Sequence, residues 1–177
     1  MNFSLNLIKV LIKYFFNYQK LNFTDVCISK FRVSPFDLDI NMHMNNGRYF
    51  TIMDLGRLDL LLQMGYLKRL IKLGYYPVIL SESMVFQRSL QCFAAYEIHS
   101  QIVGWDKKFF YLCQKFVQNN EVVASAHVRA CFKKKKQRGI IDTPTVFSIF
   151  NLNMPSTQLN ELSKHNIELD HLLLPRD

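Results

Sequence analysis

The chain has 177 residues, about the length of one domain, and its 49% hydrophobic and 20% charged residues are typical of a globular protein rather than a disordered one. Its net charge of +8 is uneven, since residues 1–138 carry 20 basic and 9 acidic groups, whereas residues 139–177 carry 2 and 5. A basic body of this kind should attract nucleic acid, an acidic membrane surface or a phosphorylated carrier molecule.

The four cysteines bear on the cellular compartment and on metal binding. No CxxC pair and no Cys/His spacing suited to zinc occurs around Cys27, Cys92, Cys113 and Cys131. Widely spaced cysteines are typical of reduced thiols in a cytosolic protein rather than of a disulfide framework. We therefore expect a cytoplasmic protein with no metal and no bound cofactor.

The amino-terminal segment, residues 1–22, is predicted to form an amphipathic helix outside the main domain. Its polar residues recur at spacings of three and four and form one narrow stripe: Asn2, Asn6, Lys9, Lys13, Asn17 and Lys20. The apolar run follows no basic cluster and precedes no small-residue cleavage site, so it is not typical of a targeting signal. It is also shorter and more charged than a membrane span of about 20 residues.

Two positions for this helix stay open. In the first, residues 3–20 lie in a membrane interface as a peripheral contact, with the lysines at the head groups. In the second, the helix docks its wide apolar face on its own domain or on a partner subunit.

The main domain, residues 23–138, is predicted to be an antiparallel sheet wrapped around one long central helix. Apolar runs and alternation predict these elements in chain order: a strand over 25–33, a long helix over 46–66, a short helix over 67–73, a turn over 74–77, and strands over 78–88, 96–102, 109–118 and 122–133. Turns are expected at 104–107 and at Asn119-Asn120. This element order belongs to the α+β class.

The end of the main domain and the segment after it differ in pattern. On the strand over 122–133, apolar residues alternate with a partly polar set that includes His127 and Arg129, so we expect one buried face. Residues 139–177 contain three prolines and only a weak helical pattern near 157–164. We expect an acidic extension that wraps the body or stays mobile.

The stretch over residues 37–49, DLDINMHMNNGRY, gathers acidic, amide and imidazole groups in a short loop directly before the long helix. Asn45 and Asn46 are suited to cap that helix, and Asp37 is expected to cap the turn. Three further polar side chains are spaced two residues apart: Asp39, Asn41 and His43.

These side chains fit the chemistry of acyl transfer. A carboxylate can activate water or attack an electrophilic carbon, and an imidazole or amide can orient water or bind negative charge. The first N–H groups of the following helix lack intrahelical partners and point toward the loop, where they can stabilise a carbonyl oxygen that becomes anionic. Hydrolysis of a thioester needs these parts and no metal.

The same stretch closely resembles the DxDxNxHxNNxxY motif of hotdog-fold thioesterases, particularly the acyl-ACP thioesterases and the small 4-hydroxybenzoyl-CoA thioesterase-like proteins. The resemblance extends through Asp54–Arg57 and Gly104–Asp106, where the chain is most similar to "thioesterase superfamily member" proteins, and it covers about residues 25–138. It implies a hotdog fold. It also implies a homodimer or a dimer of dimers, because hotdog sites usually form between two subunits.

By position, the resemblance implies that Asp39 is the catalytic carboxylate, as base or nucleophile, and that Asn41 and His43 assist it. The positions that would bind substrate, by shaping the helix start and the acyl pocket, are Asn45, Asn46 and Tyr49. Acyl-ACP thioesterases carry a second hotdog repeat with a further catalytic residue, and this chain has a single repeat.

Basic side chains are candidates for contacts with the phosphates of the carrier: Arg88, Lys133 and Lys134. Together these features predict an acyl-CoA thioesterase that releases free CoA from a fatty or aryl acyl thioester. The alternatives are an acyl-ACP thioesterase and a non-catalytic acyl- or lipid-binding protein at a membrane. Specific nucleic-acid binding is not expected, because no recognition module accompanies the charge.

Overall fold

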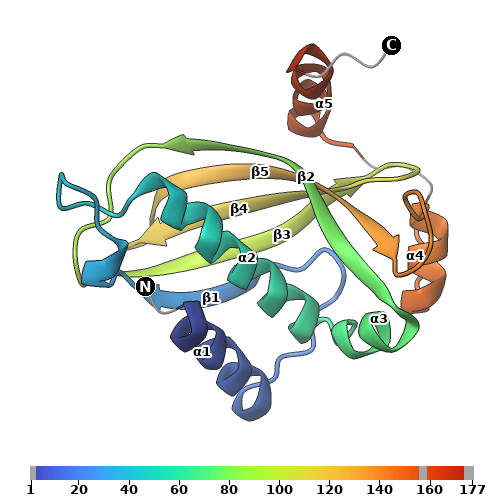
Figure 1. The fold of residues 1–177 in the computed structure, drawn as a ribbon, viewed down its shortest axis with the longest axis horizontal. Helices are drawn as coiled ribbons and strands as arrows, with labels where there is room; N and C mark the ends of the chain where they lie inside the picture. Colours follow the sequence, from blue (N-terminus) through green and yellow to red (C-terminus); the bar gives the residue numbers. More distant parts are fainter. Residues whose placement is uncertain (1–2, 156–158, 174–177) are drawn as a thin grey trace. The chain divides into compact units, whose positions relative to one another are not determined.

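The computed structural model describes residues 3–155 and 159–173 and contains a five-stranded antiparallel sheet with helices (Figure 1). In chain order the strands are β1 (Cys27–Arg32), β2 (Tyr75–Phe86), β3 (Ala95–Trp105), β4 (Phe110–Gln118) and β5 (Glu121–Lys134). They lie in the order β1-β3-β4-β5-β2, which leaves β1 and β2 at the edges. β1 pairs antiparallel with β3, with Cys27 opposite Ser100 and Arg32 opposite Ala95.

The helices are α1 (Phe3–Phe16), α2 (Asn46–Gln63), α3 (Leu67–Leu73), α4 (Thr143–Phe150) and α5 (Glu161–Leu173), with a 3-10 turn over Pro35–Asp37. α2 and α3 confirm the two helices predicted in the main domain. β2 begins at Tyr75 rather than at residue 78, because Gly74 ends α3 in the left-handed conformation with φ 77°. That one residue both caps the helix and redirects the chain.

The two turns between the last strands were predicted with different success. The turn at Asn119-Asn120 is confirmed, with φ angles of 51° and 65° as a tight hairpin requires. The preceding turn lies later than expected, because β3 continues through Trp105. There the Asp106 carboxylate accepts hydrogen bonds from the backbone N–H groups of Lys108 and Phe109, both at 2.8 Å. An aspartate that satisfies two backbone donors fixes the reversal.

The chain divides into two compact units by contact density. Unit 1 comprises Met1–Gly65, Met84–Gln101 and Gln114–Ala126, and unit 2 comprises Tyr66–Ser83, Ile102–Cys113 and His127–Asp177. The strands β2 to β5 each contribute residues to both units. The division predicted from the sequence, into residues 1–22, 23–138 and 139–177, stays a prediction.

In unit 1, helix α2 buries side chains on several sides and approaches the sheet closely at Gly56. A Cβ atom at Gly56 would lie 2.8 Å from the Ser100 hydroxyl and 3.0 Å from the Gln114 amide nitrogen. That amide donates hydrogen bonds to Ser100, at 2.8 Å, and to the Met53 carbonyl, at 3.1 Å. Gly56 therefore allows the helix to pack directly over a buried pair of polar side chains.

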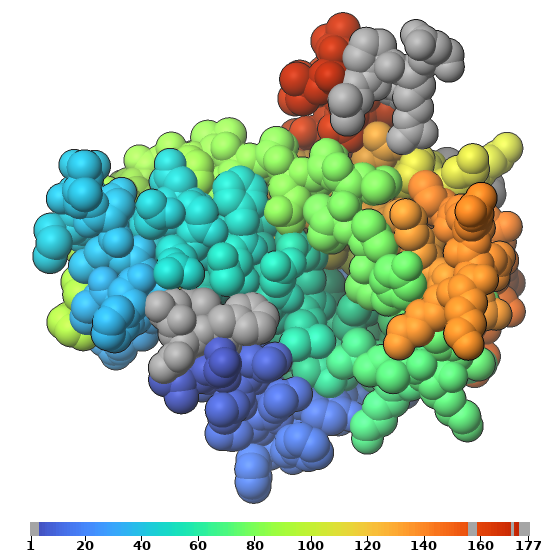
Figure 2. Space-filling model, viewed as in Figure 1, coloured from blue at the N-terminus to red at the C-terminus, as the bar shows by residue number. Residues whose placement is uncertain are grey.

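Helix α1 docks on α2 in unit 1 along one side, which includes part of its polar stripe. Asn6 and Val10 are buried, and Lys13 pairs with Asp59, a carboxylate on α2 that has no exposed surface. The apolar residues face outward, on the part of unit 1 that Figure 2 shows in dark blue: Leu5, Ile8, Leu11, Ile12, Phe15 and Phe16. Docking on the chain's own domain is confirmed, but most of the wide apolar face that was predicted to dock is exposed. The docked side instead combines Val10 with Asn6 and Lys13, because the buried Asp59 carboxylate requires a cation.

In unit 2, the carboxyl-terminal segment covers the face of β5 that was expected to be partly polar. His127 and Arg129 of β5 are buried. The Arg129 guanidinium donates to Asp170 of α5 at 3.0 Å, and His127 lies 3.3 Å from the Ser163 hydroxyl. The buried apolar face and the partly polar face of β5 are confirmed, and the polar face is buried as well, because α5 supplies partners for its side chains.

Helix α4 was missed in the sequence, although its start carries a signal. The Asp142 carboxylate accepts a hydrogen bond from the Thr145 N–H at 2.9 Å, and Pro144 lies in the first turn. The helical pattern near 157–164 corresponds to α5, which begins at Glu161; residues 157 and 158 lie outside the described part of the chain.

The close approach at Gly56 gives a prediction for stability. Gly56→Ala should lower the free energy of unfolding by about 1–3 kcal/mol, because the added methyl group overpacks the contact with Ser100. Alanine alone would favour the helix by about 1 kcal/mol, so a loss identifies the clash. Urea unfolding measures the free energy of unfolding of each variant, and Ser100→Ala supplies the control. The double variant Gly56→Ala with Ser100→Ala should lose less free energy of unfolding than the sum of the losses in the two single variants. A stabilised Gly56→Ala protein would contradict this account.

Candidate active site

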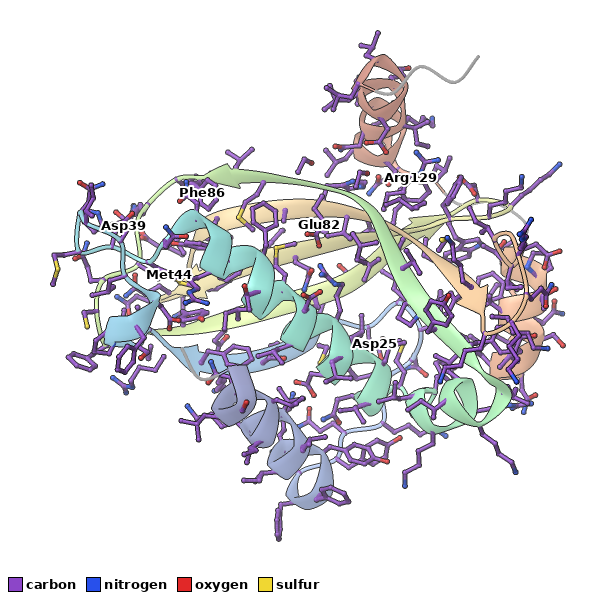
Figure 3. The ribbon with its side chains drawn as sticks, viewed as in Figure 1. Asp25, Asp39, Met44, Glu82, Phe86 and Arg129 are labelled. Carbon is purple, nitrogen blue, oxygen red and sulfur yellow. The ribbon has the colours of Figure 1, made fainter. Side chains whose placement is uncertain are left out.

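A pocket of about 330 Å³ lies in unit 1 where the motif loop meets the start of α2 and the chain that leaves β2. Figure 3 labels Asp39 on this loop and Phe86 at the end of β2. The residues that line the pocket are Asp39, Asn41, His43, Met44, Asn46, Tyr49, Phe86, Gln87, Arg88 and Ser89. Asp39, Asn41 and His43, singled out from the sequence, are therefore gathered at one cavity.

The motif loop is a tight turn that is fastened to its neighbours by backbone hydrogen bonds. The Asp39 N–H donates to the His43 carbonyl at 2.9 Å, and Met42 occupies the left-handed region with φ 61°. The Met44 N–H then donates to the Leu90 carbonyl at 2.9 Å. These bonds fix the direction of the side chains on the turn.

The Asp39 carboxylate divides its two oxygens between structure and the pocket. Oδ1 accepts hydrogen bonds from the backbone N–H groups of Asn41, at 2.8 Å, and His43, at 3.4 Å. Oδ2 makes no hydrogen bond with any of the residues that the structure describes. One oxygen therefore holds the turn, and the other is available to water or to a substrate in the pocket.

Asp37 has a structural role, as expected for a turn cap. It is 1% exposed, and its Oδ2 accepts a hydrogen bond from the Ser34 N–H at 2.9 Å. Its carbonyl accepts from the Asn45 N–H at 2.8 Å, which ties the turn to the start of α2. Its Oδ1 lies 3.9 Å from Nε of Arg48. Asp37 is not among the lining residues of the pocket.

The start of α2 faces the pocket. Asn45 is the residue that caps the helix, and its side-chain oxygen accepts a hydrogen bond from the Gly47 N–H at 2.9 Å. Asn46 and Tyr49, in the first helical turn, line the cavity. The positive end of the helix dipole is therefore directed at the place where Asp39 presents its carboxylate.

Tyr49 joins the pocket to the core of unit 1. Its ring lies edge-on to Phe86, with centroids 5.0 Å apart, and against Phe116 at 4.8 Å. Burial raises the pKa of its phenol, and a hydrogen bond with the Leu90 backbone opposes that rise in part. Tyr49 is therefore an uncharged wall of the pocket.

Asn41 is exposed and His43 is half-buried, and the imidazole makes no hydrogen bond with the described residues. The backbone of His43 is held instead, in a bridge with Gln91. A carboxylate oxygen, an imidazole and an amide thus meet at one cavity beside a helix start. This set can activate water and stabilise negative charge on a bound carbonyl.

Of the predicted phosphate contacts, only Arg88 lines this pocket. Arg88 also forms an exposed ion pair with Glu121. Lys133 and Lys134 belong to unit 2 and are not lining residues, and the Lys134 ammonium lies 5.0 Å from the centroid of the Tyr75 ring. A role for these two lysines in binding stays a prediction.

Four lining residues were missed in the sequence: Met44, Phe86, Gln87 and Ser89. Met44 lies inside the motif, but its apolar side chain gives no signal of catalytic chemistry. The other three follow one another closely at the end of β2, in a stretch without any motif spacing. The fold brings this stretch against the loop, where the Met44 N–H donates a hydrogen bond to the Leu90 carbonyl.

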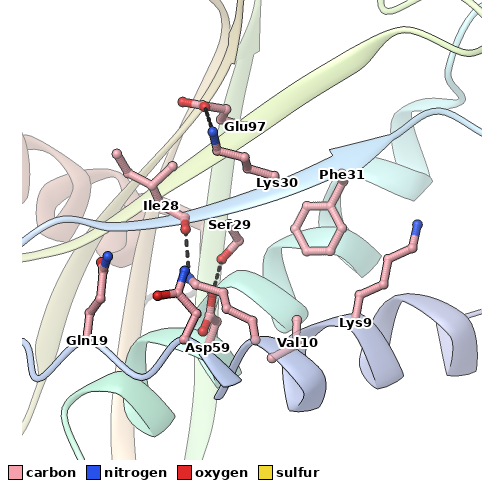
Figure 4. A pocket seen from close by; sticks show the side chains of 11 residues that line it. Lys9, Val10, Gln19, Ile28, Ser29, Lys30, Phe31, Asp59 and Glu97 are labelled. Atoms are coloured by element: carbon pink, nitrogen blue, oxygen red, sulfur yellow. Dashed lines mark hydrogen bonds and ion pairs between the residues drawn. The ribbon is translucent and has the colours of Figure 1, made fainter. Parts of the chain in front are cut away.

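A second pocket of unit 1, about 530 Å³, lies between α1, β1 and α2 (Figure 4). Beside it, the buried Asp59 accepts hydrogen bonds from the Ser29 hydroxyl at 2.6 Å, the Lys13 ammonium at 2.5 Å and the Gln63 amide at 3.1 Å. Burial, with the negative charge of Asp59, raises the pKa of the Cys27 thiol to about 12. The cluster therefore holds its carboxylate in a structural ion pair and keeps Cys27 protonated.

The described residues contain neither a membrane-spanning helix nor a cluster of metal-binding side chains. None of their helices is long and apolar enough to cross a membrane. No group of three or more His, Cys, Asp or Glu side chains among them is placed to hold a metal ion.

Comparison with known proteins places this geometry in a family. The model of the thioesterase-like superfamily matches residues 33–161. Protein THEM6 of Danio rerio is 34% identical over 95 residues, which cover 54% of this chain and 47% of that protein. The chain thus spans about half the length of this relative.

Solved structures share the fold at low sequence identity. A gentisyl-coenzyme A thioesterase has a TM-score of 0.62 at 22% identity, over 69% of this chain and 99% of the other. A hypothetical protein from Staphylococcus aureus, solved in complex with CoA, has a TM-score of 0.59 at 18% identity, over 81% and 94%. The predicted hotdog fold is confirmed.

The ion pair beside the second pocket gives a prediction for stability. Lys13→Met should lower the free energy of unfolding by about 2–3 kcal/mol, because it leaves the buried Asp59 charge without a cation. Lys9→Met is the matched control, since Lys9 lies on the same helix and lines the same pocket but is exposed. It should change stability by no more than about 0.5 kcal/mol in the same denaturant titration. Equal losses in the two variants would refute a specific role for the pair.

Proposed function

Because the chain belongs to the thioesterase-like superfamily, we propose that it is an acyl-CoA thioesterase that hydrolyses a fatty or aryl acyl thioester to the free acid and CoA. The observation that carries this proposal is the Asp39 carboxylate, which lines a pocket at the start of α2 with one oxygen held by the turn. The thioesterase activity in the names of the similar proteins belongs to those proteins. For this chain, the activity is a proposal.

In the proposed reaction, Asp39 removes a proton from water while the water oxygen attacks the thioester carbonyl. The carbonyl oxygen becomes anionic, and N–H groups at the start of α2 stabilise it. The intermediate then collapses, the carbon–sulfur bond breaks, and the thiolate of CoA takes up the proton. His43 and Asn41 orient the water and the carbonyl. Direct attack by Asp39 on the carbonyl is the other route that the same geometry supports.

The wall of the pocket suits an apolar acyl group beside a polar carrier. Phe86, Tyr49 and Met44 supply apolar surface, and Arg88 supplies positive charge at the same cavity. A guanidinium suits a phosphate because it donates two parallel hydrogen bonds. Lys133 and Lys134 are proposed as further phosphate contacts. The two candidate carriers, CoA and an acyl carrier protein, both present the acyl group on a phosphorylated arm.

A second candidate function is favoured by one observation. Asp39 Oδ1 accepts two backbone hydrogen bonds that hold the turn, so the motif residue has a structural use whether or not the chain turns over substrate. The alternative is a non-catalytic acyl- or lipid-binding protein. Wild-type protein that binds acyl-CoA but releases no thiol from either carrier would establish that alternative.

The catalytic role is tested by thiol release from a panel of acyl-CoAs and acyl-ACPs. Asp39→Asn keeps an oxygen for the turn but loses the base, so kcat should fall by about 10²- to 10⁴-fold. Asp25→Asn is the matched control, because Asp25 bonds Asn22 in a surface turn and is not a lining residue. Its rate should equal that of wild type. Equal rates for wild type and Asp39→Asn would eliminate Asp39 as the base.

We also propose a homodimer. β2 is an edge strand of the sheet and carries exposed apolar side chains, among them Leu80 and Val85. An exposed apolar edge is a template for pairing with another strand. The four cysteines are free, as expected for reduced thiols. The cytoplasmic location stays a prediction.

Sedimentation equilibrium tests the dimer. Wild type should sediment at twice the mass of the chain, and Leu80→Lys should shift the equilibrium toward monomer, because a charge is then brought to the paired edge. Ile71→Lys places the same charge on the exposed surface of α3 and should leave the mass unchanged. A monomeric wild type, or an equal effect of both substitutions, would contradict pairing through β2.

A further inference from the structure

The outward face of α1 is an exposed apolar surface on a helix whose opposite side is docked. Phe15 and Phe16 are 73% and 87% exposed, and Leu5 and Ile12 are 54% and 51% exposed. With Ile8 and Leu11 these side chains form one continuous stripe along the helix, at spacings of three and four residues. An apolar patch of this kind on a soluble unit marks an interaction surface.

The helix is held in this orientation by several bonds to unit 1. The Lys13 ammonium bonds both Asp59 and the Ile28 carbonyl, the latter at 2.8 Å. The chain that follows is fastened to Gln63 of α2, whose side-chain oxygen accepts from the Gln19 N–H at 2.8 Å. To turn the apolar stripe inward, the helix would have to break these bonds and leave Asp59 buried without its cation.

The charges around the stripe identify its partner. Residues 3–24 contain three lysines and no acidic residue. Lys13 faces inward, but Lys9 on the helix and Lys20 in the chain that follows it are exposed. The carboxyl-terminal end of the helix is aromatic: Tyr14 lies edge-on to Phe15 and to Tyr18, each at 5.5 Å. Aromatic rings and lysines that flank an apolar stripe fit the interface of a bilayer with anionic head groups.

We infer that the outward face of α1 docks unit 1 on an anionic lipid bilayer. The helix has 14 residues, too few to span the bilayer, so it lies in the plane of the interface with the apolar stripe in the acyl region. The apolar side faces the lipid, as in the first position expected from the sequence, but Lys13 is bound to Asp59 and does not reach the head groups. The inference does not depend on the proposed hydrolysis.

A second copy of the chain is the less favourable occupant of this face. Two copies placed stripe to stripe would bring the lysines of residues 3–24 together, with no acidic residue in that segment to pair with them. An anionic surface instead complements the exposed Lys9 and Lys20. The edge strand β2, on another part of the chain, is the surface proposed for dimerisation.

Co-sedimentation of the full chain with vesicles tests the inference. Wild type should bind phosphatidylcholine vesicles that contain phosphatidylserine more tightly than vesicles of phosphatidylcholine alone. Phe15→Ser with Phe16→Ser should weaken this binding at least about tenfold, because two apolar side chains no longer enter the bilayer. Lys9→Gln should weaken it about fivefold on the anionic vesicles only.

The matched control places the same change on other exposed apolar side chains. Ile71→Ser with Leu172→Ser removes residues that are 65% and 79% exposed on α3 and α5, and it should leave vesicle binding unchanged. All variants should keep the wild-type rate of thiol release from a soluble acyl-CoA. Because vesicle binding and thiol release are measured separately, an inactive wild type would contradict the proposed function and not the docking. Absent binding, equal loss in both double variants, or a change of mass in solution with Phe15→Ser and Phe16→Ser would each overturn the inference.

Discussion

A carboxylate with no exposed surface, Asp59, determines how the elements of unit 1 are assembled. Such a charge must be paired or fully bonded, and here Lys13 of α1, Ser29 of β1 and Gln63 of α2 supply the donors. One side chain thereby connects three elements. The requirement also explains why the docked side of α1 includes Lys13: docking of the wide apolar face would bury more apolar surface, but it cannot neutralise Asp59. The apolar side of the helix is left outside as a result.

At the pocket, the structural role and the proposed chemistry fall on two oxygens of the same side chain, Asp39. The backbone bonds to Asp39 Oδ1 hold the turn, and the turn sets the place of the other oxygen. Asp37 and Asn45 fasten that turn to α2, which brings the helix start to the cavity. Groups held in place in this way favour catalysis, because they need little reorganisation when negative charge develops on the bound carbonyl oxygen.

The sequence predicted those features that depend on local pattern. The period of the apolar residues located α2 and α3, the Asn119-Asn120 pair located a hairpin turn, and the dense motif located the loop of the pocket. It did not predict features that depend on distant partners. Which face of α1 docks is decided by Asp59, 46 residues away in the chain, and the burial of Arg129 is decided by Asp170. Phe86 and Ser89 reach the pocket through the chain path alone, without a local signature.

The position of α5 restricts how copies of the protein can associate. Asp170 bonds both Arg129 of β5 and the Ser81 hydroxyl of β2, and Ile167 packs on the cluster of Phe109, Tyr111 and Cys131. In unit 2 this face of the sheet is therefore occupied by the chain's own helix. Another copy that stacked on the same face would first have to displace α5 and leave the Arg129 charge without its partner. Any assembly of copies must therefore leave this face to α5 or begin by removing that helix.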